Sequence, residues 1–235
     1  MIKRLKKSDP ANNPEDRAYL DANIDVDNLI EYMALEMFVG NSDIGNTRYY
    51  RLHGTDPETG EPYKWKWIWY DVDWGFWAAR YKSPTNYTNP KGMGENGKID
   101  NTVFLTVLKV PEYRERFLRK LSDVFQTFTT DYMLEVLDQC VSEVEPELDW
   151  HFTTWADRHD TMVIGEWPTT PDGARRYWER HINQLKNTLK RRPYILWGMV
   201  KQAFELSDAQ MLEYFGPKPE QRTDATWENS DFAWD

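Results

Sequence analysis

Two aspartates, Asp71 and Asp73, directly follow the aromatic and β-branched run at residues 65–70, and Trp74 and Gly75 come next. Such a run predicts a strand, and the bulky ring followed by glycine marks where that strand stops. Both carboxylates are therefore expected at the end of a strand, facing a cleft. Paired carboxylates are hard oxygen ligands that suit Mg²⁺ or Ca²⁺, so the segment favours a divalent metal site.

An apolar segment that precedes these acids predicts the element on which they rest. Residues 25–40 carry leucine, isoleucine, methionine and phenylalanine on most sides of a helix. Asp25 or Asp27 can cap its amino end, and Gly40 can end it in the left-handed conformation. A helix that is apolar nearly all round is expected to be buried at the centre of the domain.

A hairpin is predicted after this helix, from a short strand at 47–52, a turn at 56–62 and the aromatic strand. The loop NSDIGN before the first strand carries Asp43 and Asn46, and the hairpin returns the later aspartates to that loop. Three carboxylates and an amide suit a metal–nucleotide site, where the protein positions the metal and orients the nucleophile. The alternative is structural: these side chains shape an Asx turn and cap a following turn.

The rest of the chain is mostly helical in pattern, and the expected fold class is α+β, mainly α. Helices are predicted at 101–109, 111–128, 131–145, 147–160 and 172–206, with Pro193 kinking or restarting the last one. We expect three parts: a polar tail or linker at 1–22, one domain at 23–207, and a polar tail at 208–235. Residues 80–99 form a long polar loop, of a length usually associated with function or mobility.

Composition limits the classes of protein that need to be considered. A hydrophobic content of 40% supports a core, and the net charge of −10 argues against a nonspecific nucleic-acid binder. No apolar run is long enough to span a membrane, and the single cysteine, Cys140, excludes an intrachain disulfide and is expected to be buried. The amino end has no signal peptide, so the chain as written is expected in the cytoplasm, or at the cell surface or secreted if it is truncated.

Several segments, in order, resemble the spore-coat protein H (CotH) kinase family. The closest stretches are residues 38–52, residues 65–77 with KWKWIWYDVDWGF, residues 103–123, and the late RRPYI. The resemblance extends from about Asp25 to about Leu206. It implies the carboxy-terminal lobe of a protein-kinase-like fold that uses ATP and Mg²⁺ or Mn²⁺ to phosphorylate serine or threonine in a partner protein.

The resemblance also implies a role for each acidic residue. Asp43 is similar to the catalytic aspartate that orients the acceptor hydroxyl, and Asn46 to the asparagine that assists the metal. Asp73, before Trp74 and glycine, is similar to the metal-binding aspartate, and Asp71 would share the metal or support Asp73. Asn46 follows Asp43 by three residues, whereas five separate the pair in ordinary kinases.

The amino end departs from a kinase because residues 1–24 contain neither a strand-rich segment nor a glycine-rich loop. A missing amino-terminal lobe would leave an exposed apolar patch near Trp65–Trp69 and favour self-association. The alternative function is a catalytically inactive structural or surface protein that binds a partner through its aromatic face. A third interpretation is carbohydrate binding by the many tryptophans.

Two further groups of residues are more simply explained as solvated helix faces than as sites. The first comprises His151 and His159, with Asp157 and Asp160 nearby. The second is a basic stripe made of Arg175, Arg176, Arg180, Lys190, Arg191 and Arg192, which could otherwise bind an acidic partner or a phosphate.

Overall fold

The computed structural model describes residues 1–41, 43–76, 84–89, 93, 99–155, 168 and 170–226. Its elements are α1 Ile2–Leu5, α2 Pro14–Asn23, α3 Val26–Val39, the 3₁₀ turn η1 Ile44–Asn46, β1 Arg48–Tyr50, β2 Lys66–Ile68, α4 Pro84–Tyr87, α5 Thr102–Leu108, α6 Pro111–Thr127, α7 Thr130–Trp155, α8 Pro171–Ala203 and α9 Asp208–Phe215. The two strands form one antiparallel pair. The predicted class, α+β and mainly α, is confirmed.

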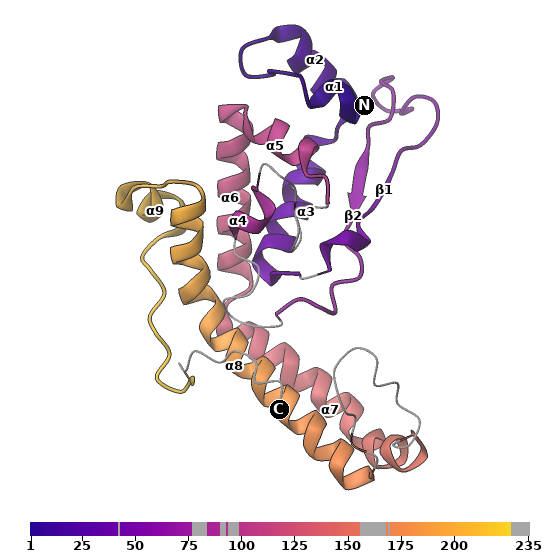
Figure 1. Ribbon diagram of the computed structural model, residues 1–235, viewed down its shortest axis with the longest axis vertical. Coiled ribbons are helices and arrows are strands. Elements are labelled where there is room, and N and C mark those ends of the chain that lie inside the picture. Colours follow the sequence, from indigo (N-terminus) through magenta and orange to yellow (C-terminus); the bar gives the residue numbers. More distant parts are fainter. Residues whose placement is uncertain are drawn as a thin grey trace.

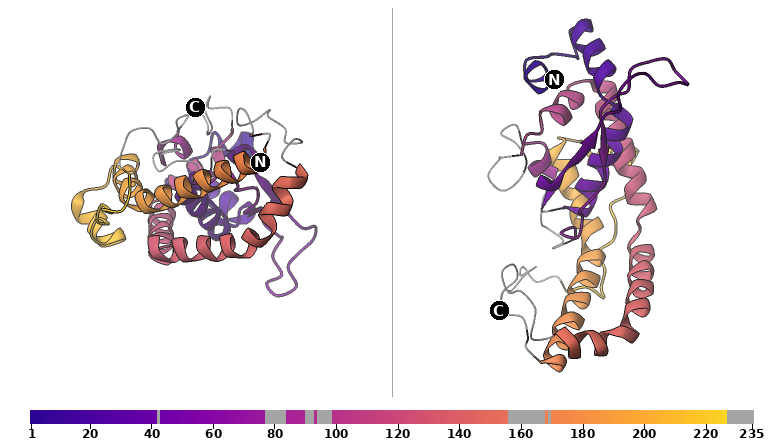
Figure 2. Two further views of the ribbon diagram at one scale, coloured as in Figure 1. Left: turned by 90° about the horizontal axis from the view of Figure 1, so that it is seen from below. Right: turned by 90° about the vertical axis from the view of Figure 1, so that its right-hand side faces the viewer.

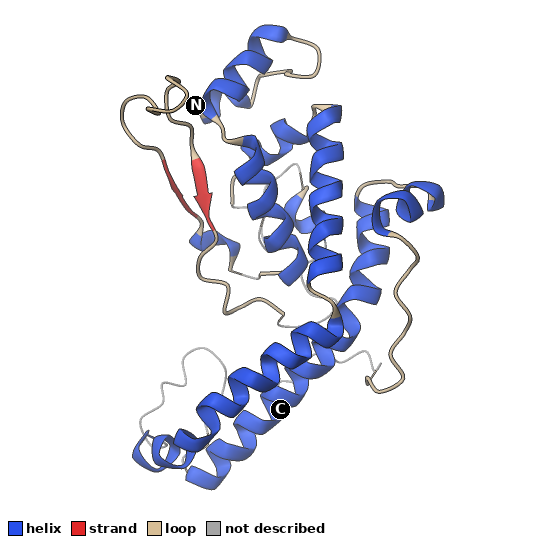
Figure 3. Ribbon diagram, turned by 180° about the vertical axis from the view of Figure 1, so that it is seen from behind, coloured by secondary structure: helices blue, strands red, loops and turns tan. Residues whose placement is uncertain are grey.

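The elements form a body and a long helical arm (Figure 1). In the body, α3 packs along α6, and the hairpin of β1 and β2 lies beside α3. In the arm, α7 leads away from the body and α8 returns beside it, as the side view and the rear view also show (Figures 2 and 3). The returning end of α8 leads to α9, which packs on α6. The arm thus joins the late part of the chain to the body.

Helix α3 is the central helix that the sequence predicts. The Asp25 carboxylate caps it by accepting a hydrogen bond from the Asn28 N–H at 3.1 Å. Gly40 ends it with φ 65°, a conformation that glycine adopts without a steric penalty. Its most deeply buried side chains, each at most 2% exposed, are Leu29, Ile30, Met33, Ala34, Glu36, Met37 and Phe38. The helix is therefore a rigid support for whatever follows its carboxyl end.

The hairpin is shorter than the sequence pattern predicts. Tyr49 pairs with Trp67, and β2 ends at Ile68 instead of continuing to the acids. Trp67 packs against the core, and α3 lies behind it. Asp71 has φ 59°, which an extended strand cannot accommodate, so the chain turns before the acids. Asp71 and Asp73 consequently lie in a turn beyond the strand.

The two predicted tails are wrong, because both contain helices that contribute to the core. In the first, Asn13 caps α2 and Pro14 opens it, while Leu5 and Leu20 are fully buried. In the second, α9 buries Met211. Each of these segments is mostly polar, but Leu5, Leu20 and Met211 lie on the face that meets the core.

Two further predictions are wrong in the arm. The predicted break between 131–145 and 147–160 does not occur, because α7 continues through Pro146. Helix α8 likewise continues through Pro193. Packing of the two helices on each other offsets the cost of proline in a helix interior. Cys140, predicted to be buried, is exposed on α7.

Some predictions fall on residues that the structure does not describe. These are most of the loop 80–99 outside α4, and His159 with Asp157 and Asp160. Among the described helices, none combines the length and the apolar character needed to cross a membrane.

Candidate functional site

Three of the predicted site residues meet at the carboxyl end of α3. The Asn46 side-chain amide donates one hydrogen bond to Asp43 Oδ2 at 2.8 Å and another to Asp71 Oδ2 at 2.9 Å. Asp43 and Asn46 lie at the start and end of η1, while Asp71 arrives from the far side of the hairpin. One amide therefore holds two carboxylates from separate segments close together.

Asn41 positions both acidic segments, and the sequence analysis missed it. Its side chain is 2% exposed and accepts a hydrogen bond from the Asp43 N–H at 3.0 Å. Its amide nitrogen also donates to the backbone carbonyl of Asp71 at 3.3 Å. The signal was available: an asparagine directly after the glycine that ends a buried helix is suited to bind local backbone groups.

The turn that carries Asp71 is fastened to the same helix end. The Phe76 N–H donates to the Val39 carbonyl at 2.7 Å, and the Gly75 N–H donates to the Val72 carbonyl at 2.8 Å. A Cβ at Gly75 would lie 2.9 Å from that Val72 oxygen and 3.2 Å from the Val39 side chain. Only glycine fits this close approach, which explains the glycine that follows the predicted metal ligands.

Asp73 does not join the cluster. Its side chain is exposed, and the hydrogen bonds that connect Asp43, Asn46 and Asp71 do not include it. In the part of the chain that the structure describes, no three acidic, histidine or cysteine side chains are grouped so that they could hold a metal. The existing oxygen donors are thus the two carboxylates and the Asn46 amide, a set that matches the preference of Mg²⁺ and Mn²⁺ for hard ligands.

A buried carboxylate, Glu36, lies one helical turn before the site. Glu36 is 1% exposed, and this burial raises its pKa to about 7, although hydrogen bonds with Asn41 and Tyr32 oppose the rise. Tyr32 in turn donates to the Thr47 hydroxyl at 3.4 Å, and burial raises the pKa of Tyr32. A polar network therefore connects the interior of α3 to both ends of η1.

Two more buried polar side chains hold the end of α3. The Tyr87 hydroxyl lies 3.0 Å from the Glu36 carbonyl and 3.2 Å from the Asn41 carbonyl. Arg192 of α8, which is fully buried, donates to the carbonyls of Phe38 at 3.1 Å and Met37 at 3.0 Å. A cation is favourable at a helix carboxyl end. Arg192 therefore positions the site, and the prediction that it belongs to a solvated stripe is wrong.

An apolar hollow of about 320 Å³ is lined by residues on both sides of the turn that carries Asp71. Phe76, at the end of the site turn, lines it together with Trp69, and Cys140 lines it from α7. Its other lining residues are apolar or aromatic: Leu35, Phe38, Val39, Phe128, Tyr132, Met133, Val136, Leu137, Leu185 and Leu189.

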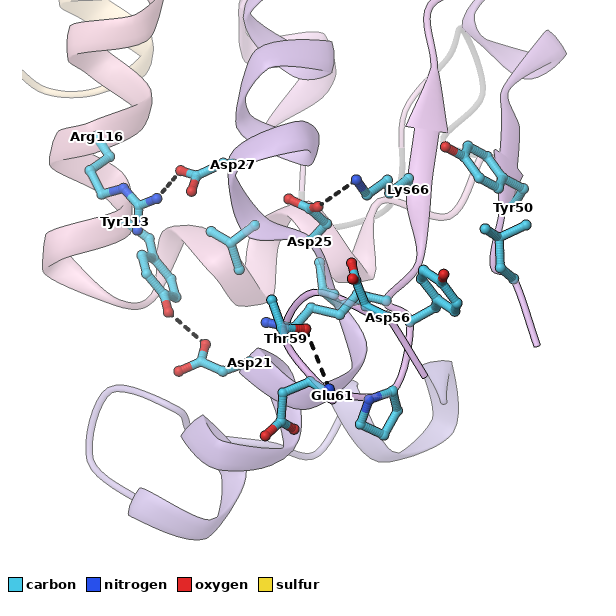
Figure 4. Close-up of a pocket in the computed structure, with 16 residues that line it drawn as sticks. Asp21, Asp25, Asp27, Tyr50, Asp56, Thr59, Glu61, Lys66, Tyr113 and Arg116 are labelled. Carbon is cyan, nitrogen blue, oxygen red and sulfur yellow. Dashed lines mark hydrogen bonds and ion pairs between the residues drawn. The ribbon is translucent and has the colours of Figure 1, made fainter. Parts of the chain in front are cut away.

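A second acidic pocket, of about 500 Å³, lies at the opposite end of the hairpin (Figure 4). Its acids have partners within the protein. Lys66 lies 3.3 Å from Asp25, and Arg116 pairs with Asp27. The Tyr113 hydroxyl donates to Asp21 at 2.5 Å, and burial and this acid raise the pKa of Tyr113 to about 12. These contacts fasten α2, α3 and α6 together, which is a structural role.

The structure is thus a mainly helical body with a short hairpin and an acid–amide cluster at the carboxyl end of α3. The family model described as CotH kinase protein matches residues 1–196, and the chain belongs to this family. The match includes α1 and α2, which the sequence analysis had assigned to a tail. Searches of curated proteins and of solved structures found no match.

Proposed function

We propose that this chain transfers the γ-phosphoryl group of ATP to serine or threonine hydroxyls of a partner protein. The observation that carries the proposal is the cluster of Asp43, Asn46 and Asp71. Its two carboxylates meet through one amide. No lysine, arginine or histidine of the described chain pairs with either of them. Family membership supports the same class of activity.

Each residue has a role in the proposed reaction. Asp43 orients the acceptor hydroxyl and takes its proton as the oxygen bonds to the γ-phosphorus. The bond between that phosphorus and the β,γ-bridging oxygen breaks, and ADP leaves with the electron pair. Mg²⁺ or Mn²⁺, when bound, would neutralise phosphate charge. Asp71, Asn46 and the nearby Asp73 are the residues proposed to hold it.

The apolar hollow supports a location for the nucleotide base. A purine ring stacked against Phe76 or Trp69 would leave its phosphates directed towards the turn that carries Asp71. The kinase-like lobe, like the base position, is part of the proposal.

Calorimetric titration of MgATP and MnATP into the purified chain tests the proposal. We expect micromolar binding that the isosteric variant Asp71→Asn abolishes, because the change removes a metal ligand's charge. Asp27→Asn, which neutralises an acid already paired with Arg116, is the matched control and should bind normally. Equal binding by Asp71→Asn, or no binding by the folded native chain, would contradict the proposal.

A second candidate function is a catalytically inactive interaction protein. Exposed large residues on the hairpin and the loop after it favour it: Tyr49, Tyr50, Leu52, Ile68, Trp69 and Tyr70 are each more than 40% exposed. Exposed apolar side chains therefore lie near the predicted position at Trp65–Trp69, although Trp65 and Trp67 themselves pack on the core. Partner binding that survives Asp43→Asn, without detectable phosphoryl transfer by the native chain, would favour this function.

A further inference from the structure

The two edges of the hairpin differ. The outer edge of β2 is occupied, because the Trp67 N–H donates to Asn28 Oδ1 at 2.6 Å and the Trp67 carbonyl accepts from Asn28 Nδ2 at 3.1 Å. The Trp65 N–H likewise donates to the Asn23 carbonyl at 2.8 Å. The side chain of Asn28 thus occupies the position of a neighbouring strand.

The register then fixes where the backbone of β1 points. Trp67 directs its N–H and carbonyl away from β1, so its partner Tyr49 directs its own away from β2. In the described chain, no backbone hydrogen bond outside the hairpin reaches residues 48–52. Figures 1 and 3 show the hairpin at the margin of the body. Within the part of the chain that the structure describes, the outer edge of β1 is therefore an open strand edge.

The side chains along this edge indicate what would bind it. Arg48 and Arg51 are exposed, and neither is paired with a carboxylate of the described chain. The Arg48 guanidinium lies over the Tyr70 ring, 5.3 Å from its centroid, but this contact leaves its charge unneutralised. Cations that no carboxylate of the described chain neutralises are conspicuous in a chain of net charge −10. Tyr49 is 59% exposed and Leu52 is 54% exposed, so apolar surface accompanies the charge. The chemistry favours an extended segment with acidic flanks and alternating apolar side chains.

Position connects this edge to the acidic cluster. Strand β1 begins at Arg48, directly after the η1 turn that carries Asp43 and Asn46. A segment lying along β1 would therefore pass the cluster. Main-chain hydrogen bonds supply affinity in this mode of recognition, and side chains supply specificity.

We propose that the open edge of β1 takes an extended, acidic segment of another protein as a third strand. The segment's identity as the phosphoryl acceptor rests on the proposed function; the docking itself does not. The strand would hold its serine or threonine hydroxyl near Asp43.

Fluorescence anisotropy with the labelled synthetic peptide EEVSVSVEE tests the docking. Tyr49→Pro removes the outward N–H at a position where proline costs no ladder bond. Tyr49→Val is the matched control, because both variants lose the ring that contacts Trp65 and Trp67. We expect Tyr49→Pro to weaken binding at least tenfold and Tyr49→Val at most threefold. Equal affinities of the two variants would overturn the proposal.

Charge gives a second test that leaves the backbone intact and does not depend on the proline variant folding. Reversing both Arg48 and Arg51 to Glu should weaken EEVSVSVEE at least tenfold and favour the basic peptide KKVSVSVKK. Lys7→Glu reverses an exposed cation that lies outside the hairpin. It is the control and should change neither affinity. An unchanged preference in the double variant would contradict an acidic partner.

Two comparisons distinguish peptide docking from phosphoryl transfer and from self-association. Asp43→Asn should bind the peptide normally while losing phosphoryl transfer, so a failure of catalysis is distinguishable from a failure of docking. Sedimentation velocity detects the other occupant, a second copy of the chain. A dimer of the native chain that Tyr49→Pro dissociates, together with no peptide binding, would overturn the peptide as occupant.

Discussion

The hairpin separates two groups of acids that look alike in composition and differ in their partners. At its tip, Asp25 and Asp27 pair with Lys66 and Arg116. At its other end, the Asp43 and Asp71 carboxylates share an amide hydrogen-bond donor, Asn46, and pair with no cation of the described residues. Acids that the protein neutralises itself stabilise the fold, whereas acids held together without a cation are available to a cation from outside. Whether acids pair with a cation of the protein, rather than how many acids there are, therefore distinguishes a candidate binding site from a structural contact.

The largest effect should come from the cation that holds the helix end beneath the site. Arg192→Met would leave the carbonyls of Met37 and Phe38 without their buried donor. We expect a loss of roughly 3–5 kcal/mol in the free energy of unfolding, measured by urea denaturation. Arg176→Met on the exposed face of the same helix is the control. A loss below about 1 kcal/mol would show that the carboxyl end of α3 does not depend on Arg192.

Glu36, near the carboxyl end of α3, makes the free energy of unfolding depend on pH. Its pKa is raised from 4.5 to about 7, so the folded chain binds a proton more tightly than the unfolded chain. Stability from this group is complete below about pH 4.5 and is lost as pH rises through 7. Between pH 5 and 8 we expect a loss of roughly 2–3 kcal/mol that Glu36→Gln removes. Glu31→Gln, an exposed acid of the same helix, should leave the slope unchanged.

The two groups of acids should respond oppositely to neutralisation. Asp25→Ala removes the α3 cap and the contact with Lys66, and should cost about 1 kcal/mol. Asp71→Asn relieves repulsion with Asp43 and should leave stability unchanged or raise it by a few tenths of a kcal/mol. Added Mn²⁺ should raise the melting temperature of the native chain and of Asp25→Ala, but not of Asp71→Asn. The same metal response in both variants would remove the distinction between the groups.

The smallest expected effect is on the rate at which Cys140 reacts with a maleimide. Cys140, the single cysteine, is exposed and lines the hollow proposed for the base. Saturating MgATP should slow its reaction with a maleimide about threefold, a modest effect because the hollow stays partly open. Asp71→Asn should show no protection, and protection that persists in this variant would place the nucleotide away from the acids.

The sequence was sufficient where local pattern determines structure. The cap and the terminating glycine of α3 are local signals, and the turn at 56–62 sets the hairpin. These together bring Asp71 to the loop of Asp43 and Asn46, as predicted. The roles in catalysis and metal binding stay predictions, because proximity does not establish them.

The rest could not be predicted because it depends on contacts between distant segments. Nothing near Arg192 in the sequence distinguishes it from the exposed Arg176, since its burial arises where it meets the distant carboxyl end of α3. Leu5 and Leu20 lie in short helices with few apolar residues, so periodicity does not reveal them. Pro146 misled for the same reason, because tertiary packing overrides a local helix breaker.

The contact between Arg192 and Phe38 spans 154 residues of sequence. During synthesis from the amino end, α3 and both acidic segments would leave the ribosome long before the guanidinium that fastens them. Fragments that end within the arm would then contain every proposed site residue and still lack a fixed helix end. Competence would then depend on a helix that is made after every proposed site residue.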